Sequence, residues 1–455
     1  MLSNSSKTKQ QNLFYSPLSD MLDMNDPLIA LSNAIDWKIF ENEFAGFYSK
    51  DGSPAKPIRL MVGLLILKQL ENLSDESIVI QWKRNPYYQY FCGYNEMQLC
   101  EPCHSTQLVK FRQRIGKKGM ELIFKVSVQL HGSCAEEQQV LIDTTVQEKN
   151  ITYPTDGKLA IKMIHHLHKI GKKEQLNLRR TFVKEIKEHR INLRFFKHPK
   201  KIKKARSSIK RLRTIVGILI RDISRNLKQD KLSNYTNTFD LFDKVRNQQI
   251  KDSNKVLSLH ESHVYAITKG KDHKKYEYGT KASIVATKDS GVIVGVASHS
   301  KNEHDSKTLE AALISANKTR TTAIKEVICD RGYRGIKEVL GTIISIPGTT
   351  LKKDTEYQKQ QKRDKFKRRA AIEPIIGHLK SDFRLARNYL KGFIGDQINL
   401  LLAATAWNLK KWMNIYFFAI ISGEMKLLLE SIKQIKLYNQ IFLQLIVIKL
   451  IFTHP

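Results

Sequence analysis

The spacing of apolar residues changes partway along this chain, and that change constrains the fold more than any other feature of the sequence. Between about residues 28 and 132, apolar residues recur with a helical period, as in "PIRLMVGLLILKQLENLSDESIVIQW". From "QVLIDTTVQ" onwards, short runs rich in β-branched residues appear with the period of a strand. Because strand runs followed by helices are typical of a sheet covered by helices, we predict an α/β (α+β) domain with a mixed sheet, preceded by an all-helical domain.

Later runs predict the remaining elements. Strands are expected at "VYAITKG", "EYGTKASIVAT", "GVIVGVASHS", "KEVICD" and "TIISIPG". Helices are expected at 305–318, at about 361–385, and through "DQINLLLAATAWNLKKWMNIYFFAI". The first of these helices has Asp305 or Ser306 as its expected cap.

A basic helical segment interrupts the sheet domain after its first strand. Residues 158–246 have a helical period throughout and contain 26 Lys and Arg against 7 Asp and Glu, a net charge of +19. A pair of solvated amphipathic helices would explain the pattern, but solubility does not require this charge in one segment, so we expect contact with nucleic acid. The candidate DNA-binding residues are Lys200, Lys201, Lys203 and Lys204 here, and Lys110, Arg112 and Arg114 in the helical domain.

The composition of the whole chain points to an acidic partner. With 455 residues, 77 Lys and Arg against 44 Asp and Glu give a formal charge of +33, which favours nucleic acid first and an anionic membrane second. Membrane insertion is disfavoured, because the most apolar segment, 441–452, is short and contains Gln444 and Lys449. The N-terminus lacks the apolar core of a signal peptide, and the five cysteines are typical of a reducing cytosol, so a cytoplasmic protein is expected.

Two aspartates close short apolar runs. Asp143 ends "VLID" and Asp330 ends "VICD", the position at which a sheet presents side chains to a site at its edge. Either residue alone could be a turn or helix-cap aspartate. Because two aspartates occupy this kind of position, we expect both side chains to lie in one functional site.

A third acid lies in a later helix. At about 100° per residue, Phe366, Arg369, Glu373 and Lys380 fall within roughly 60° of one helical face. Pro374 either kinks this helix or marks its first turn, with Glu373 as the cap. In the second case Arg369 would leave that face but could still lie close to Glu373.

Three carboxylates that converge repel one another unless a cation lies among them. Mg²⁺ (or Mn²⁺) is the expected cofactor, because it takes hard oxygen ligands and leaves sites for water and substrate phosphate. Two such ions would activate a nucleophile and stabilise the leaving oxygen at phosphorus. The cations expected to position DNA phosphates near the acids are Arg331, Arg334, Arg369 and Lys380.

Other acids and a histidine have weaker claims to the site. Asp156, in "TYPTDGKL", is expected in a turn or as a helix cap. Asp305 is expected as a cap, with support of the catalytic site as the alternative, and His304 beside it could be a zinc ligand, a base or neither. Cys100 and Cys103 have zinc-like spacing, but no second pair follows them, so a structural or incidental role is favoured.

The chain resembles bacterial insertion-sequence transposases of the DDE class, specifically the insertion sequence five family and its relatives with a Tyr-Arg-Glu-Lys signature. The resemblance rests on blocks in the same order, including "NPYYQYFCG", "LIDTTVQEKNITYPTD", "CDRGYRG" and "IEPIIGHLKSDFRLARNYLKG". It implies an RNase H-like catalytic domain, with the first acid on the first strand, the second after the fourth strand and a glutamate on a later helix. These correspond to Asp143, Asp330 and Glu373, whereas Phe366 replaces the signature tyrosine.

These arguments give a division of the chain and a function. We expect a flexible arm at 1–27, a helical DNA-binding domain at 28–132, a catalytic domain at 133–420 with the insert at about 158–250, and an amphipathic helix at 421–455. The resemblance implies a transposase that cleaves the ends of its element and joins them to target DNA, as a homodimer on double-stranded DNA and associated with the bacterial nucleoid. A metal-dependent nuclease without strand transfer and a catalytically silent DNA-binding protein are the alternatives.

Overall fold

The computed structural model describes residues 16–49, 54–249, 251–271, 274–346, 348, 351 and 353–452, without the side chains of 269–271, 274, 366 and 424–452. Residues 1–15 of the expected flexible arm lie outside this description. The rest of the arm is not free, because Leu18 in α1 (Leu18–Met21) is fully buried and its N–H donates to the Asn95 carbonyl at 2.7 Å. The expected arm is therefore wrong for the residues around Leu18.

The N-terminal region is helical, as predicted. Its helices are α2 (Pro27–Ala34), α3 (Trp37–Ala45), α4 (Ile58–Leu70), α5 (Asp75–Arg84), α6 (Pro86–Phe91) and α7 (Ser105–Gln129). The Ser74 side chain caps α5 by accepting from the Ser77 N–H at 3.0 Å, and Asn85 caps α6 ahead of Pro86. These caps explain why two apolar segments of one run form separate helices.

One predicted DNA contact in this region is buried. Arg112 is 4% exposed, and its Nη1 donates to Asp75 Oδ1 at 2.8 Å. Lys68 Nζ lies 3.0 Å from the same carboxylate, and burial lowers the pKa of Lys68 to about 8 although Asp75 opposes the shift. The guanidinium of Arg112 is thus used inside the protein, and its predicted contact with DNA is wrong. Lys110 and Arg114 on the same helix are exposed.

The sheet is mixed, as predicted. Its strands are β1 (Gln139–Glu148), β2 (Tyr265–Lys271), β3 (Lys274–Thr287), β4 (Ile293–His299), β5 (Glu326–Ile328), β6 (Glu338–Val339) and β7 (Thr342–Ser345). The order is β2-β3-β1-β5-β7-β6, and β4 also pairs with β3. β1 is antiparallel to β3 and parallel to β5, and β5 is parallel to β7.

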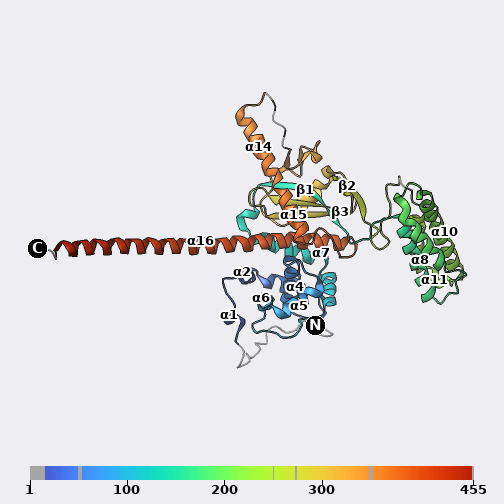
Figure 1. The fold of residues 1–455 in the computed structure, drawn as a ribbon, viewed down its shortest axis with the longest axis horizontal. Helices are drawn as coiled ribbons and strands as arrows, with labels where there is room; N and C mark the ends of the chain where they lie inside the picture. The colour runs from blue at the N-terminus through green and yellow to red at the C-terminus, as the bar shows by residue number, and fades with distance from the viewer. Residues whose placement is uncertain are drawn as a thin grey trace.

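The first part of α16 (Gly392–Phe452) runs between the sheet and the N-terminal helices (Figure 1). One apolar cluster contains Leu64 of α4, Val285 of β3 and Leu401 of α16. The boundary expected near residue 132 is therefore not a break in the core. The N-terminal helices and the sheet stabilise each other through this shared helix.

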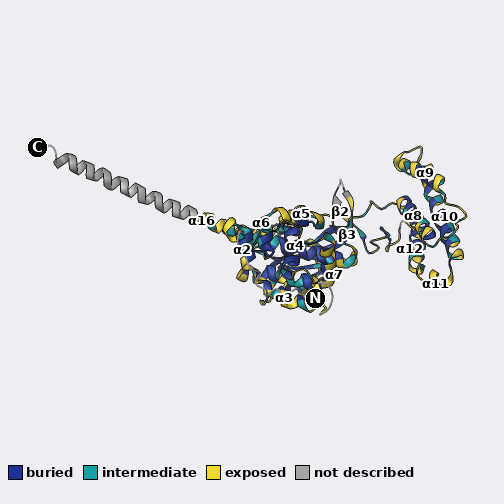
Figure 2. Cartoon of the chain, turned by 90° about the horizontal axis from the view of Figure 1, so that it is seen from below, coloured by how far each residue is buried: buried dark blue, intermediate teal, exposed yellow. Residues whose placement is uncertain are grey.

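The segment between β1 and β2 forms a separate group of helices, which we call the insert helices. They are α8 (Asp156–Lys173), α9 (Val183–Asn192), α10 (Ile202–Asn226), α11 (Gln229–Leu232) and α12 (Thr236–Asn247), with a 3₁₀ turn, η2 (Leu193–Lys197). Their buried residues, including Leu167, Leu219 and Phe242, make a second apolar cluster. Figure 1 shows them apart from the sheet, and Figure 2 shows their buried residues facing inward. Thr155 caps α8, so Asp156 is its first residue rather than its cap.

The remaining elements follow the strands. They are η1 (Gly132–Ala135), η3 (Asp305–Thr308), α13 (Leu309–Asn317), η4 (Arg331–Tyr333), α14 (Glu356–Ala370) and α15 (Ile372–Ser381). α16 continues unbroken across most of the expected C-terminal segment, of which 453–455 lie outside the described residues. Within the described part of the chain, no helix is both long enough and apolar enough to cross a membrane.

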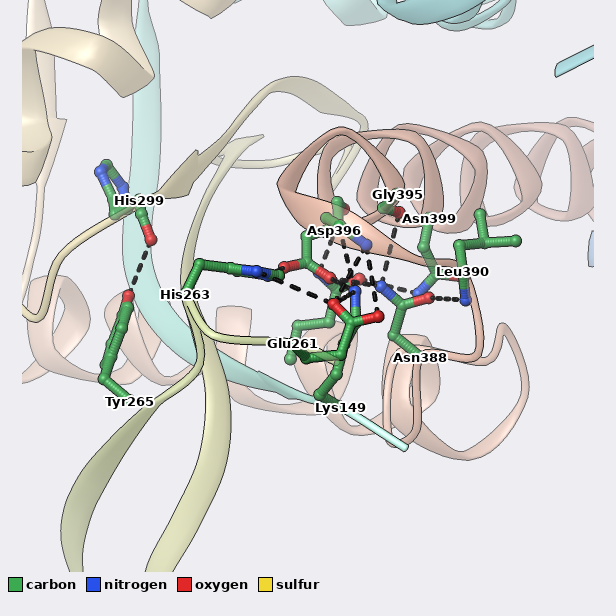
Figure 3. A network of polar contacts seen from close by, with 12 residues as sticks. Lys149, Glu261, His263, Tyr265, His299, Asn388, Leu390, Gly395, Asp396 and Asn399 are labelled. Carbon is green, nitrogen blue, oxygen red and sulfur yellow. Dashed lines mark hydrogen bonds and ion pairs between the residues drawn. The ribbon is translucent and has the colours of Figure 1, made fainter. Parts of the chain in front are cut away.

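A buried polar network joins the end of β1 to α16 and to the segment that returns from the insert helices (Figure 3). Lys149 Nζ lies 2.5 Å from Asp396 Oδ1 and 3.4 Å from Glu261 Oε2, with side chains 3%, 1% and 3% exposed. His263 Nε2 and Asn388 Nδ2 also bind the Asp396 carboxylate, at 2.9 and 2.6 Å. Both chain segments that lead to the insert helices are thus held to α16.

Candidate active site

The register of the parallel strands brings the two aspartates to the same edge of the sheet. Leu141 of β1 pairs with Ile328 of β5, which is the last pair between these strands. Asp143 and Asp330 each lie two residues further along, so they stand at the same level. Asp143 is still paired within the sheet, opposite Ile284 of β3.

Asp330 begins the short turn that follows β5. Its Oδ1 accepts from the Gly332 N–H at 2.8 Å and caps η4. The second strand-end acid therefore has the cap geometry expected of a turn aspartate, and it also faces the site. It follows the fifth strand in chain order, because β2, which leads back from the insert helices, precedes the long strand β3.

Glu373 comes from α15, after a break at Ala371. α14 ends at Ala370 and α15 begins at Ile372, so Pro374 lies in the first turn of α15, where its missing N–H costs no hydrogen bond. Ala371 is the N-cap residue, and the expected capping role of Glu373 is wrong.

The guanidinium of Arg369 contacts all three acids. Nη2 lies 3.5 Å from Asp143 Oδ2 and 3.7 Å from Asp330 Oδ2, and Nη1 donates to Glu373 Oε1 at 2.8 Å. The Arg369 and Asp143 side chains are 18% and 17% exposed, whereas Glu373 is 59% exposed. One cation thus offsets carboxylates drawn from a strand, a turn and a helix, which we call the acid triad.

A fourth carboxylate lies next to the acid triad. Asp305 Oδ1 accepts from the Thr144 hydroxyl and from Lys281 Nζ, both at 2.9 Å. His304, not Asp305, supplies the side chain that caps η3, so the expected cap is wrong and the alternative, support of the site, fits the contacts. Thr144 and Lys281 were not predicted. The signal for Lys281 is a lysine within the apolar strand "EYGTKASIVAT".

The acids change the proton affinities of two buried neighbours. Burial raises the pKa of Cys329 to about 12, and the carboxylates of Asp330 and Asp143 add to the shift. Burial, and then the charges of Asp305, Asp143 and Asp330, raise the pKa of Tyr333 above its usual range. Both groups therefore stay protonated at neutral pH, and the negative charge of the site resides on the carboxylates.

The other predicted site residues differ in exposure and in the groups that they contact. Arg331 and Arg334 are exposed on η4 and directly after it. Lys380 of α15 faces the buried Glu277 of β3, with Nζ 3.9 Å from Oε2. His304 is exposed, and the side chain of Phe366 lies outside the described residues. Exposed positions at the start of α10 are held by Lys200, Lys201, Lys203 and Lys204.

The donors of the acid triad suit a hard cation. Among the described residues, no three His, Cys, Asp or Glu side chains are arranged to hold one metal ion. The carboxylates are instead arranged around the Arg369 guanidinium, within 3.7 Å of its nitrogens. These oxygen donors come from separate elements and already share one positive charge, and carboxylate oxygens are the donors that Mg²⁺ takes.

Gly332 lies close to two carboxylates. A Cβ at this residue would lie 2.9 Å from Asp330 Oδ1 and 3.1 Å from Asp305 Oδ2. Gly332→Ala is expected to displace the Asp330 and Asp305 carboxylates and so to lower the rate of the metal-dependent DNA cleavage that we propose below, by up to about 100-fold. Gly377→Ala is the matched control, because a Cβ there meets no atom within 4 Å. Equal cleavage rates for the two variants in a gel assay would contradict this placement of Gly332.

Comparisons with known proteins find two family models that match separate parts of this chain. The family described as Transposase domain (DUF772) matches residues 16–114, and the Transposase DDE domain matches residues 252–409. An uncharacterized protein of Rhizobium meliloti, ORF8 in the nfe locus, is 36% identical over 194 residues, which cover 42% of this chain and 94% of that protein. No solved structure matches this chain. Asp330, Arg369 and Glu373 lie within the second matched range, whereas Asp143 and the insert helices lie outside both.

Proposed function

This chain belongs to the DDE transposases, and from that premise we propose that it cleaves DNA at the ends of its own mobile element and joins the freed 3′-hydroxyl to target DNA. The observation that carries the proposal is the convergence of the acid triad on one guanidinium. It supports Asp143 as the first of the three acids, although neither family match reaches this residue.

We assign the acid triad to metal binding. Asp143, Asp330 and Glu373 would hold Mg²⁺ or Mn²⁺, as two ions. When bound, these would activate the attacking water or hydroxyl and stabilise the leaving oxygen. Thr144 and Lys281 hold the adjacent Asp305, which keeps its carboxylate turned toward η4. Arg369, displaced from the acids, would lie where it can bind the phosphate under attack.

A basic hollow lies next to the site. It has a volume of about 690 Å³ and lies between α14 and the turn after β3. Its charged lining residues are four cations, Lys288, Lys365, Lys367 and Arg368, and two acids, Asp289 and Asp364, which leaves an excess of two positive charges. Because Arg369 lies in the last turn of α14 and contacts the acid triad, this hollow offers phosphate contacts that lead toward the acids.

The lysines at the start of α10 are also assigned to DNA. Lys203 and Lys204 lie in its first turn, directly after Lys200 and Lys201. Cations are unfavourable at the positive end of a helix dipole, so stability of the free protein does not explain them. Bound phosphate would offset both the lysines and the dipole.

The finer assignments follow from the family resemblance. We propose membership of the insertion sequence five group with an RNase H-like catalytic domain, action as a homodimer that holds two element ends, and a location in the bacterial cytoplasm at the nucleoid. The replacement of the signature tyrosine by Phe366 removes a hydroxyl that relatives carry.

The test is a strand-transfer assay. Full-length protein is incubated with labelled duplexes from the DNA that borders its gene and with a supercoiled plasmid, in Mg²⁺ or in EDTA. Labelled plasmid that forms only with Mg²⁺ is the expected result. Cut ends without joined plasmid would favour a metal-dependent nuclease that does not carry out strand transfer. Binding without cutting would favour a DNA-binding protein without catalytic activity.

A further inference from the structure

A groove lined by basic residues lies on the insert helices, which stand apart from the sheet that carries the acid triad (Figure 1). A groove of about 370 Å³ runs along α10 beside the end of α12. Its cationic lining residues are Arg206, Lys210, Arg213, Arg221 and Arg246. We name this surface the arginine groove, and we propose that it binds the phosphodiester backbone of duplex DNA. The inference rests on the proposed function and adds to it a contact surface separate from the catalytic site.

The charges of the arginine groove are only partly neutralised. Arg213 pairs with Asp156 at 2.8 Å and Arg246 pairs with Asp243 at 2.9 Å. Among the described residues, Arg206, Lys210 and Arg221 form no ion pair with an acid. Five cations against two acids leave an excess of three positive charges along one groove, which only a polyanion would offset at several points.

The absence of a side chain at Gly217 lets two of these guanidiniums lie close to each other. A Cβ at Gly217 would overlap Nη1 of Arg246 and would lie 3.4 Å from Nη1 of Arg221. Two positively charged groups therefore lie over the same position of α10. The Arg246 Nε is buried without a hydrogen-bond partner among the described residues. Such an arrangement costs free energy in the unbound protein and is relieved by an anion placed between the two groups.

The length of the arginine groove fits DNA better than a small anion. Arg206, Lys210, Gly217 and Arg221 recur along one face of α10, over about 22 Å at 1.5 Å per residue. That length covers about six base-pair steps of duplex DNA at 3.4 Å.

The experiment removes charge inside and outside the arginine groove. The full-length variant R206Q/K210Q/R221Q is compared with K169Q/K172Q/K187Q, which removes the same charge from exposed positions of the insert helices outside the groove. Fluorescence anisotropy is measured with a labelled duplex from the DNA bordering the gene and with a scrambled duplex of equal length. We expect the groove variant to lose at least tenfold in affinity and to lower the salt slope by about 2 to 3, and the control to lose less than threefold.

The two duplexes identify which DNA the arginine groove contacts. Loss on the bordering duplex alone assigns the groove to element ends, and equal loss on both assigns it to DNA of any sequence; either result supports the inference. Equal losses for the groove and control variants overturn it. The fold is checked by circular dichroism, and Gly217→Ala, which displaces Arg246 without changing charge, is expected to weaken binding several-fold. Wild-type affinity for Gly217→Ala would contradict the role of Arg246.

The same preparations separate this inference from the proposed function. Wild-type protein that binds DNA through the arginine groove but gives no metal-dependent cutting refutes the proposed function alone. If the wild-type protein cuts and joins DNA, but the groove variant and the control variant lose equal DNA affinity, the role of the arginine groove alone is refuted. Absence of DNA binding by the wild-type protein refutes both.

Discussion

Asp143→Asn, Asp330→Asn and Glu373→Gln are each expected to lower DNA cleavage by at least about 1,000-fold, while binding to DNA stays within a few-fold of wild type. Each substitution removes a carboxylate that would bind the metal ions, and loss of three orders of magnitude corresponds to about 4 kcal/mol of transition-state stabilisation. Binding should persist because we assign DNA binding to the basic surfaces, which these substitutions leave unchanged. Single-turnover cleavage of labelled duplex in Mg²⁺ measures the first quantity, and anisotropy measures the second.

Glu310→Gln is the control for these variants. Glu310 is an exposed acid in the first turn of α13, outside the site. Its replacement should leave cleavage unchanged. Normal cleavage by any one of the three site variants would remove that residue from the proposed metal ligands, and Asp305 would then be the next carboxylate to replace.

Lys149→Met is expected to destabilise the protein by about 3–5 kcal/mol, because it removes one partner of a buried charge network. Asp396 and Glu261 would keep carboxylates that are 1% and 3% exposed, without the lysine that lies 2.5 and 3.4 Å from them. Urea unfolding followed by circular dichroism measures the change. Since the network joins the end of β1 and the segment before β2 to α16 (Figure 3), the unfolding transition of the sheet domain should be affected first.

Lys231→Met gives the matched comparison. Lys231 also pairs with an acid, Glu174 at 2.7 Å, but its side chain is 51% exposed. Water compensates such a pair, so the urea midpoint should stay close to that of wild type. Similar midpoints for both lysine variants would show that the Lys149 network contributes little to stability.

The local sequence determined most of the secondary structure and the positions of two of the three acids along the chain. The β-branched runs predicted β1 to β5 and β7, and the helical period predicted the N-terminal region, because both patterns record which side chains face a core. The positions of Asp143 and Asp330 at the ends of apolar runs were also visible, since parallel strands bring such ends to one edge. The residue types also predicted that Asp143, Asp330 and Glu373 share one site, and their binding of metal ions stays a prediction.

Tertiary structure decided what local pattern does not encode. Whether a cation is exposed depends on contacts between segments distant in sequence, so Arg112 is buried against Asp75 although the pattern assigned it to DNA. Arg369 contacts carboxylates from β1 and from the turn after β5, and the arginine groove includes Arg246 of α12, whose side chain lies against Gly217 of α10. The reason is geometric: period and propensity act within a few residues, whereas charge neutralisation depends on which surfaces packing brings together.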